Sequence, residues 1–167
     1  RQRSHVIGLV SDKIASSPFA GDLVLGAQDA AFERGWLLTL VDSGGDVALE
    51  TRQIAALVHY PVDGILYARM FHQRVTVPEG VRGMPHVLLN AEDHDRRSSW
   101  IAPDEAGAAR TAVAELINAG HRRIGFLNND QNVLAAAERL DGYRAALAEA
   151  GLKYAPELVT RESPDVR

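Results

Sequence analysis

The sequence has no cysteine among its 167 residues, which excludes disulfide bonds and thiolate metal sites and fits a reducing compartment. It has no apolar run approaching the roughly 18 to 20 residues that a membrane-spanning helix needs. It has no excess of basic residues, because 18 lysines and arginines stand against 22 acidic residues, a net charge of −4. We therefore expect a cytoplasmic protein that contacts no membrane, and we expect any DNA contact to come from residues outside this chain.

The loop after the first expected strand lacks glycine. Residues 6–36 read "VIGLVSDKIASSPFAGDLVLGAQDAAFERGW", which predicts a buried strand, a polar loop over 11–17 and a helix that ends at Gly35. Loops that cradle phosphates in this position need several glycines, so that backbone N–H groups can approach the anion. The chain also lacks the tight strand-to-helix turn that presents a nucleophilic serine. We expect no catalytic residues, no enzyme activity and no cofactor.

What the sequence does contain is one repeated alternation of strands and helices. Helical spacing and capping residues predict helices over about 19–35, 46–61, 104–120 and 136–151. Apolar strands are expected at 5–10, 36–42, 62–68, 86–91, 98–102 and 123–128. Strands that are apolar throughout and separated by amphipathic helices require a parallel sheet covered on both faces. The predicted fold class is a doubly wound α/β fold.

Ligands in such sheets bind outside the carboxyl ends of the strands. Here these ends are the loops expected to begin at Ser11, Asp42, Ala68, Asn90 and Asn128. Hydroxyl, amide and carboxylate groups around an aromatic ring suit a neutral polyol such as a sugar, because its hydroxyls need both donors and acceptors. The alternative, that the serines and aspartates only form turns and cap the helix near Phe19, stays open at this point. The candidate side chains on these loops are Asp12, Ser16, Ser17, Phe19, Arg69 and Asn90.

Five stretches together resemble one protein family. They read "IGLVSDKIASSPFAGDLVLGAQDAAFERG", "VDGILYA", "PHVLLNA", "PDEAGAARTAVAELINAGHRRIGFLNND" and "ERLDGYRAALAEAGL". In this order they resemble the effector-binding domain of the lactose-repressor (LacI) family of transcriptional regulators. The resemblance implies a periplasmic-binding-protein-like fold with two subdomains, of which the second is incomplete. It assigns residues 1–4 to a linker from a missing DNA-binding headpiece, 5–102 to the first α/β subdomain and 103–167 to the truncated start of the second.

The resemblance also implies a set of ligand contacts. The family's Asn-Pro-Phe-Phe loop reads Ser17-Pro18-Phe19-Ala20 here, which keeps one aromatic ring and a shorter polar group. Asn90 and Ala91 stand where the family often has an Asp-Arg pair, so the charged clamp is lost. Arg139 matches a family arginine that reaches the ligand. The implied ligand-binding residues are Ser17, Phe19, Asn90 and Arg139, with Asp12, Ser16 and Arg69 as further candidates.

The function implied by the resemblance is that of an effector-sensing, dimerising module. A small sugar-like effector would bind in a cleft between the subdomains and alter operator binding, through a headpiece absent from this chain. A homodimer is implied as well. The alternative is a solute-binding receptor of a sugar transport system, because periplasmic sugar receptors share this fold.

Two polar clusters receive structural interpretations. The cluster at 92–95, Glu-Asp-His-Asp, has metal-ligand residue types, but adjacent residues on a polar loop rarely converge on one ion. We therefore expect no metal site. The cluster at 121–123, His-Arg-Arg, follows Gly120 at a helix end, where cations interact favourably with the helix dipole. A local structural role is therefore favoured over contact with DNA.

Overall fold

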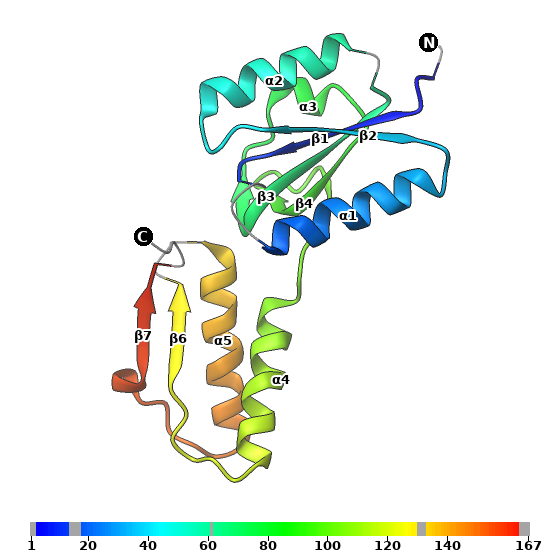
Figure 1. Ribbon diagram of the computed structural model, residues 1–167. Coiled ribbons are helices and arrows are strands. Elements are labelled where there is room, and N and C mark those ends of the chain that lie inside the picture. Colours follow the sequence, from blue (N-terminus) through cyan, green and yellow to red (C-terminus); the bar gives the residue numbers. More distant parts are fainter. Residues whose placement is uncertain (1–2, 14–17, 61, 130–132, 164–167) are drawn as a thin grey trace. The chain divides into compact units, whose positions relative to one another are not determined.

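The computed structural model describes residues 3–13, 18–60, 62–129 and 133–163. The chain divides into two compact units, unit 1 at residues 1–102 and unit 2 at 103–167 (Figure 1). Each unit has its own sheet and its own hydrophobic core. Within the described residues, no helix combines the length and apolar character that crossing a membrane requires.

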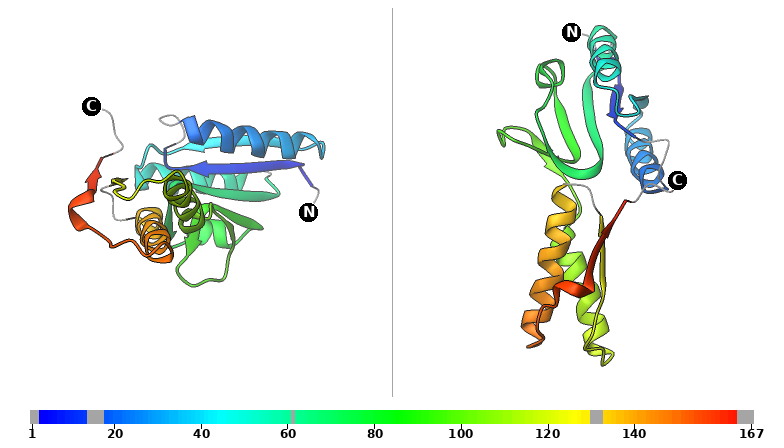
Figure 2. Two further views of the ribbon diagram at one scale, coloured as in Figure 1. Left: turned by 90° about the horizontal axis from the view of Figure 1, so that it is seen from below. Right: turned by 90° about the vertical axis from the view of Figure 1, so that its left-hand side faces the viewer.

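Unit 1 is built on a five-stranded sheet in the order β2-β1-β3-β4-β5. Every pairing in it is parallel, as predicted. Helix α1 lies on one face, and α2 and α3 lie on the other (Figures 1 and 2). Successive residues Leu9 and Val10 on β1 are both fully buried, because both faces of the sheet are covered. The elements of unit 1 are β1 (Val6–Ser11), α1 (Pro18–Phe32), β2 (Leu37–Asp42), α2 (Val47–His59), β3 (Gly64–Val75), α3 (Glu79–Arg82), β4 (His86–Asp93) and β5 (Ser99–Ile101).

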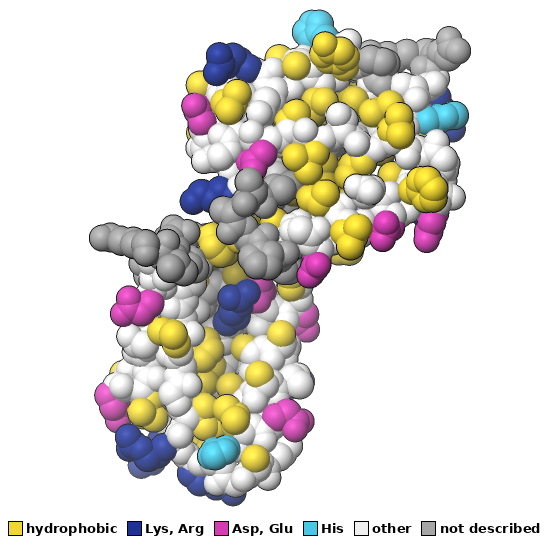
Figure 3. Space-filling view, in the orientation of Figure 1, with side chains coloured by type: hydrophobic (Ala, Val, Ile, Leu, Met, Phe, Trp, Pro, Cys, Tyr) yellow, Lys and Arg dark blue, Asp and Glu magenta, His cyan; other side chains and the backbone are white. Residues whose placement is uncertain are grey.

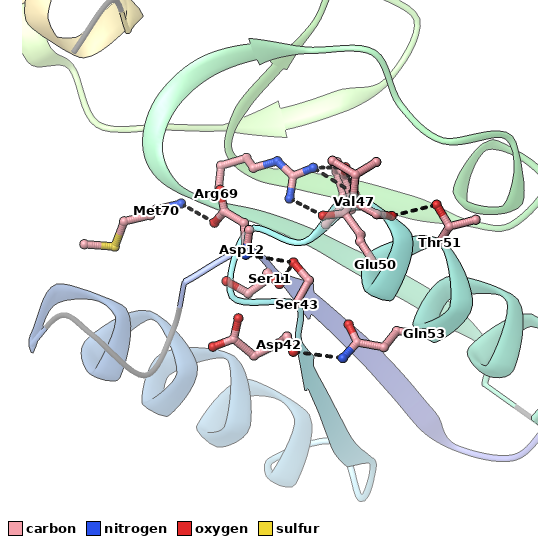
Figure 4. Close-up of polar contacts among 12 residues, drawn as sticks. Ser11, Asp12, Asp42, Ser43, Val47, Glu50, Thr51, Gln53, Arg69 and Met70 are labelled. Atoms are coloured by element: carbon pink, nitrogen blue, oxygen red, sulfur yellow. Dashed lines mark hydrogen bonds and ion pairs between the residues drawn. The ribbon is translucent and has the colours of Figure 1, made fainter.

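Helix α2 illustrates how the sequence specifies one of these elements. Asp46 caps its start, where the carboxylate accepts hydrogen bonds from the backbone N–H groups of Ala48 and Leu49 at 2.8 and 3.0 Å. Ile54 and Leu57 are buried in the core of unit 1. The helix is thereby fixed against the sheet, with its first turn beside the carboxyl end of β1 and beside Tyr67 and Arg69 of β3 (Figure 4).

Strand β3 is longer than the sequence predicts. We expected a strand over 62–68 followed by a loop, and this boundary is wrong, because β3 continues to Val75. After a register shift between Ala68 and Gln73 it pairs with β4 again, with Gln73 opposite Ala91. The polar residues of the extension are typical of a loop, yet from Gln73 to Val75 the chain pairs with β4 as a strand. β4 likewise continues to Asp93, so Asn90 lies within a strand instead of opening a loop.

Unit 2 contains two helices packed together and a small sheet. Its elements are α4 (Glu105–Asn118), β6 (Phe126–Asn129), α5 (Leu134–Glu149), a 3-10 turn (Pro156–Leu158) and β7 (Val159–Glu162), and β6 and β7 are parallel. Tyr143 is fully buried, and its hydroxyl donates to the carbonyl of Ile124 at 3.0 Å. Gly142 lets α5 approach α4, since an added Cβ would lie 2.1 Å from the Ala106 carbonyl oxygen. The sequence did not predict β7 or α3.

Unit 1 also leaves large apolar side chains on its surface. Figure 3 shows hydrophobic side chains between polar ones over this part of the molecule. Single exposed apolar residues are normal in proteins, whereas several on one element indicate a surface that meets another partner. The most exposed large apolar residues of unit 1 are Leu25, Phe32, Leu37, Val47, Tyr60 and Ile101.

Candidate functional site

Polar side chains gather at the carboxyl edge of the unit 1 sheet. Ser11 and Asp42 end β1 and β2 in register with each other, and Ser43 follows them with its backbone N–H bonded to the Ser11 carbonyl at 3.0 Å. The first turn of α2 and the start of the β3 extension border the same edge (Figure 4). This is the edge where doubly wound folds bind ligands. This carboxyl edge is termed the sheet edge.

A buried ion pair forms the centre of the sheet edge. Arg69 donates two hydrogen bonds to the carboxylate of Glu50, at 2.7 and 3.0 Å, and both side chains are only 12% exposed (Figure 4). The Tyr67 hydroxyl donates to the same carboxylate at 2.7 Å and also contacts Arg69. The guanidinium lies 4.2 Å from the centre of the Tyr67 ring. Such a two-point arginine–carboxylate bond is among the strongest polar contacts in proteins.

The charges in this cluster are mutually stabilised. Burial acts to raise the pKa of Glu50, but hydrogen bonds from Arg69 and Tyr67 and the positive charge of Arg69 outweigh it and lower that pKa. Burial acts to lower the pKa of Arg69, and the contact with Glu50 raises it instead. Burial, reinforced by Glu50, raises the pKa of the Tyr67 hydroxyl. At neutral pH the cluster is therefore a charged pair with a neutral tyrosine.

Asp12 and Asn90 connect the strands around this pair. One carboxylate oxygen of Asp12 accepts a hydrogen bond from the backbone N–H of Met70 at 2.9 Å. The Asn90 amide donates to the carbonyls of Arg69 and Met70, at 3.1 and 3.0 Å. Asn90 has a φ of 55°, a left-handed conformation that asparagine adopts more easily than most residues. The side chain of Asn90 is therefore held in one orientation at the sheet edge.

Two side-chain amide oxygens at this edge, those of Gln53 and Asn90, are buried without a hydrogen-bond partner among the described residues, and Asn90 is the predicted site residue of the two. Asn90 as a whole is only 5% exposed. Because a buried carbonyl without a partner is costly, such an atom marks a place where a donor is expected to bind.

The structure brings together Asp12, Arg69 and Asn90 of the predicted site residues. Ser16 and Ser17 lie outside the described residues. Phe19 is in the first turn of α1, but its side chain is outside the description as well. Their contacts therefore stay predictions.

Arg139, on α5 of unit 2, has a partner that the sequence analysis missed. It donates to the carboxylate of Glu105 at 2.6 and 3.0 Å. The Glu105 side chain is 7% exposed and that of Arg139 is 46% exposed. Glu105 lies in the first turn of α4, directly after the capping residue Asp104. The predicted role of Arg139 toward a ligand stays a prediction.

Glu50 was also missed, although the sequence carried a signal for it. It precedes Ile54 by one helical turn and Leu57 by two, on the side of α2 that packs inward. A glutamate on an inward-facing side requires a partner, because a buried lone carboxylate is costly. The sequence could not identify Arg69 as this partner, because Arg69 lies in the extension of β3, which the sequence did not predict.

The acidic cluster at 92–95 has a different role from the metal ligands its residue types suggest. Asp93 is buried and accepts hydrogen bonds from Arg82, at 3.0 and 3.3 Å, and from the Ser98 hydroxyl at 2.9 Å. Burial acts to raise the pKa of Asp93, and these hydrogen bonds lower it overall. Asp93 therefore fixes the turn after β4. Within the described part of the chain, no group of three or more potential ligands could hold a metal ion.

A doubly wound α/β unit with polar side chains gathered at its sheet edge is the architecture of a small-ligand-binding domain. The chain belongs to the family described as periplasmic binding proteins and sugar binding domain of LacI family, whose model matches residues 4–167. This confirms the resemblance and the fold class seen in the sequence.

Named relatives and solved structures agree with this assignment. The HTH-type transcriptional regulator CelR of Thermobifida fusca is 32% identical over 167 residues, which is 95% of this chain and 48% of that protein. The ribose operon repressor of Escherichia coli strain K12 is 31% identical over 152 residues, 90% of this chain and 46% of the repressor. A structure described as a transcriptional regulator CelR–cellobiose complex matches with a TM-score of 0.80 at 30% identity. The match covers 98% of this chain and 52% of the chain in that structure. The chain thus spans about half the length of the curated relatives it matches.

Proposed function

We propose that this chain is the effector-binding part of a transcriptional regulator and that its sheet edge binds a small polar ligand of the sugar class. Family membership supports this proposal, as does the solved relative in complex with cellobiose. The relatives named above are a regulator and a repressor, which favours this function over that of a transport receptor. They are not named as enzymes, in keeping with a binding role.

The observation that carries the proposal is the buried amide oxygen of Asn90. It lacks a partner among the described residues, while the amide nitrogen of the same side chain is fully engaged. A ligand hydroxyl that donates to this oxygen would satisfy it. The sheet edge is thereby prepared for a hydroxyl-bearing ligand.

Neighbouring groups extend the same chemistry. Asp12 supplies a carboxylate that accepts hydrogen bonds from ligand hydroxyls. Arg69 has five N–H groups, and its contacts with Glu50 and Tyr67 leave donors over for a hydroxyl. Ser16, Ser17, Phe19 and Arg139 complete the proposed contacts, on the strength of the family resemblance.

For the complete protein we propose a cytoplasmic homodimer that reaches operator DNA through a headpiece outside this chain. Ligand binding then alters DNA affinity only to the extent that the ligand binds two conformations unequally. The exposed apolar residues Leu25 and Phe32, 56% and 82% accessible on α1, support self-association. Light scattering on the complete protein should give the mass of a dimer, and a monomer at tens of micromolar would contradict this part of the proposal.

Calorimetry on the complete protein, with neutral sugars that include cellobiose and ribose, tests the binding site. Asn90→Ala should weaken the binding of the responding sugar by about fivefold to tenfold, the value of one hydrogen bond to a buried neutral group. Asn118→Ala, at the exposed end of α4, is the control and should bind as the unmodified protein does. Equal affinities for the two variants would place the ligand elsewhere.

A further inference from the structure

The two arginines among the predicted site residues, Arg69 and Arg139, are each held by a buried glutamate. Glu50 binds Arg69 through both carboxylate oxygens in unit 1. Considered by itself, unit 2 repeats the arrangement, because Glu105 binds Arg139 through both of its carboxylate oxygens. Both side chains of the Glu50–Arg69 pair are only 12% exposed, so solvent screens this pair weakly. In unit 2 the Glu105 side chain is 7% exposed but that of Arg139 is 46% exposed, so solvent screens that pair more strongly.

The remaining charges at the sheet edge do not favour an anion either. Asp12 and Asp42, at the ends of β1 and β2, add two negative charges to this edge. Among the described residues next to them, Lys13 adds one positive charge. The Asp42 carboxylate accepts from the backbone N–H of Gly44 at 2.9 Å and so is fixed at this edge. The described part of the sheet edge therefore carries more negative than positive charge.

We propose that Glu50 is a specificity-determining residue, which withholds Arg69 from anionic ligands, so that the ligand is an uncharged sugar and not a sugar phosphate. This inference rests on the proposed function of the sheet edge. A phosphate that displaced Glu50 from Arg69 would break two charge-assisted hydrogen bonds and leave the buried Glu50 carboxylate unpaired, which is strongly unfavourable. A phosphate that used only the remaining N–H groups of Arg69 would place a second negative group beside the Glu50 carboxylate, at an edge that already carries more negative than positive charge. A neutral hydroxyl meets no such penalty, because it can use the donors of Arg69 while the ion pair stays intact.

Matched sugar pairs test this inference in the unmodified complete protein. Calorimetry is performed with glucose and glucose 6-phosphate, ribose and ribose 5-phosphate, and cellobiose and its 6-phosphate. For the pair that responds, the neutral sugar should bind at least tenfold more tightly than its phosphate. Its affinity should change little between low and high salt, since no net charge is brought to the site.

The variant Glu50→Gln isolates the charge of Glu50. Glutamine keeps nearly the same shape and can still accept hydrogen bonds from Tyr67 and Arg69, but it no longer neutralises the guanidinium. The preference for the neutral sugar should therefore fall by about fivefold or more. The control Glu149→Gln alters an exposed pair, in which Arg110 and Glu149 lie 3.1 Å apart, and should leave the preference unchanged.

The outcomes separate this inference from the proposed function. Tighter binding of a sugar phosphate than of its neutral partner, in the unmodified protein, would overturn the inference and leave the sugar-binding function standing. An unchanged preference in a folded Glu50→Gln variant would also overturn it. Failure of every sugar and sugar phosphate to bind would contradict the proposed function itself. Melting curves without ligand show whether the variant is folded, and the measurement on the unmodified protein does not depend on it.

Discussion

Glu50 carries a negative charge on the side of α2 that otherwise packs apolar residues against the sheet. Its pairing with Arg69 and Tyr67 makes this position compatible with burial and joins α2 to β3 at the sheet edge. Asn90, on β4, fixes the same edge from the other side through the carbonyls of Arg69 and Met70. Single polar residues thus determine both the geometry and the charge that a ligand meets.

The pairing of Glu50 predicts a specific response to acid. Its pKa in the folded protein lies below the ordinary value of 4.5, so on acidification the unfolded chain takes up a proton first. The stabilisation is complete above about pH 5 and is lost as the pH falls through the lowered pKa. The free energy of unfolding should then decrease as this group takes up a proton.

Urea unfolding of the complete protein between pH 6 and pH 3 measures this effect. Glu50→Gln should show a flatter dependence on pH than the unmodified protein, because its amide does not titrate. Glu149→Gln, which changes only the exposed pair with Arg110, should follow the unmodified curve. A Glu50→Gln curve parallel to that of the unmodified protein would show that Glu50 gains no stability from its contacts.

At the scale of elements, α4 and α5 depend on a close approach at Gly142. Gly142→Ala would place a methyl group 2.1 Å from the Ala106 carbonyl oxygen, and the two helices would have to separate. We expect a loss of about 2 to 3 kcal/mol of stability, from overpacking in a core that contains Tyr143 and Leu147.

Gly26→Ala in α1 is the matched control for this change. Nothing lies within 4 Å of an added Cβ at Gly26, so the substitution should be neutral or raise stability by up to about 1 kcal/mol. Thermal unfolding monitored by circular dichroism measures both variants. Equal melting temperatures for Gly142→Ala and Gly26→Ala would contradict the close packing of α4 on α5.

Whole helices and strands show most clearly how much of the structure could be predicted from the sequence. Apolar strands alternating with capped helices predicted the parallel sheet, and the caps Asp46 and Asp104 are confirmed. The extension of β3 past Ala68 was not predictable, because its residues are mostly polar and it pairs with β4 again only after a register shift, from Gln73 onward. The same extension brings Arg69 to Glu50, so the centre of the site could not be predicted either. Asp12, Arg69 and Asn90 could be chosen as candidates, since each lies where a predicted strand ends.

At the scale of the whole molecule, charge argues against DNA binding by this chain alone. The net charge is −4, and the face in view in Figure 3 shows lysines and arginines scattered over the surface. Sequence-specific binding needs a positive surface for phosphates and an element that enters a groove. Residues 1–167 alone should therefore give no specific shift of any operator fragment in a gel assay at physiological salt. A salt-resistant, sequence-specific shift would contradict this prediction.

The sheet edge of unit 1 is proposed to bind a sugar through Asn90. A crystal structure of the complete protein with the sugar that responds in calorimetry tests this proposal most directly. We expect a ligand hydroxyl within about 3 Å of the amide oxygen of Asn90, with the Glu50–Arg69 pair intact beside it. A ligand bound away from Asp12, Arg69 and Asn90, with the Asn90 oxygen still without a donor, would contradict this proposal.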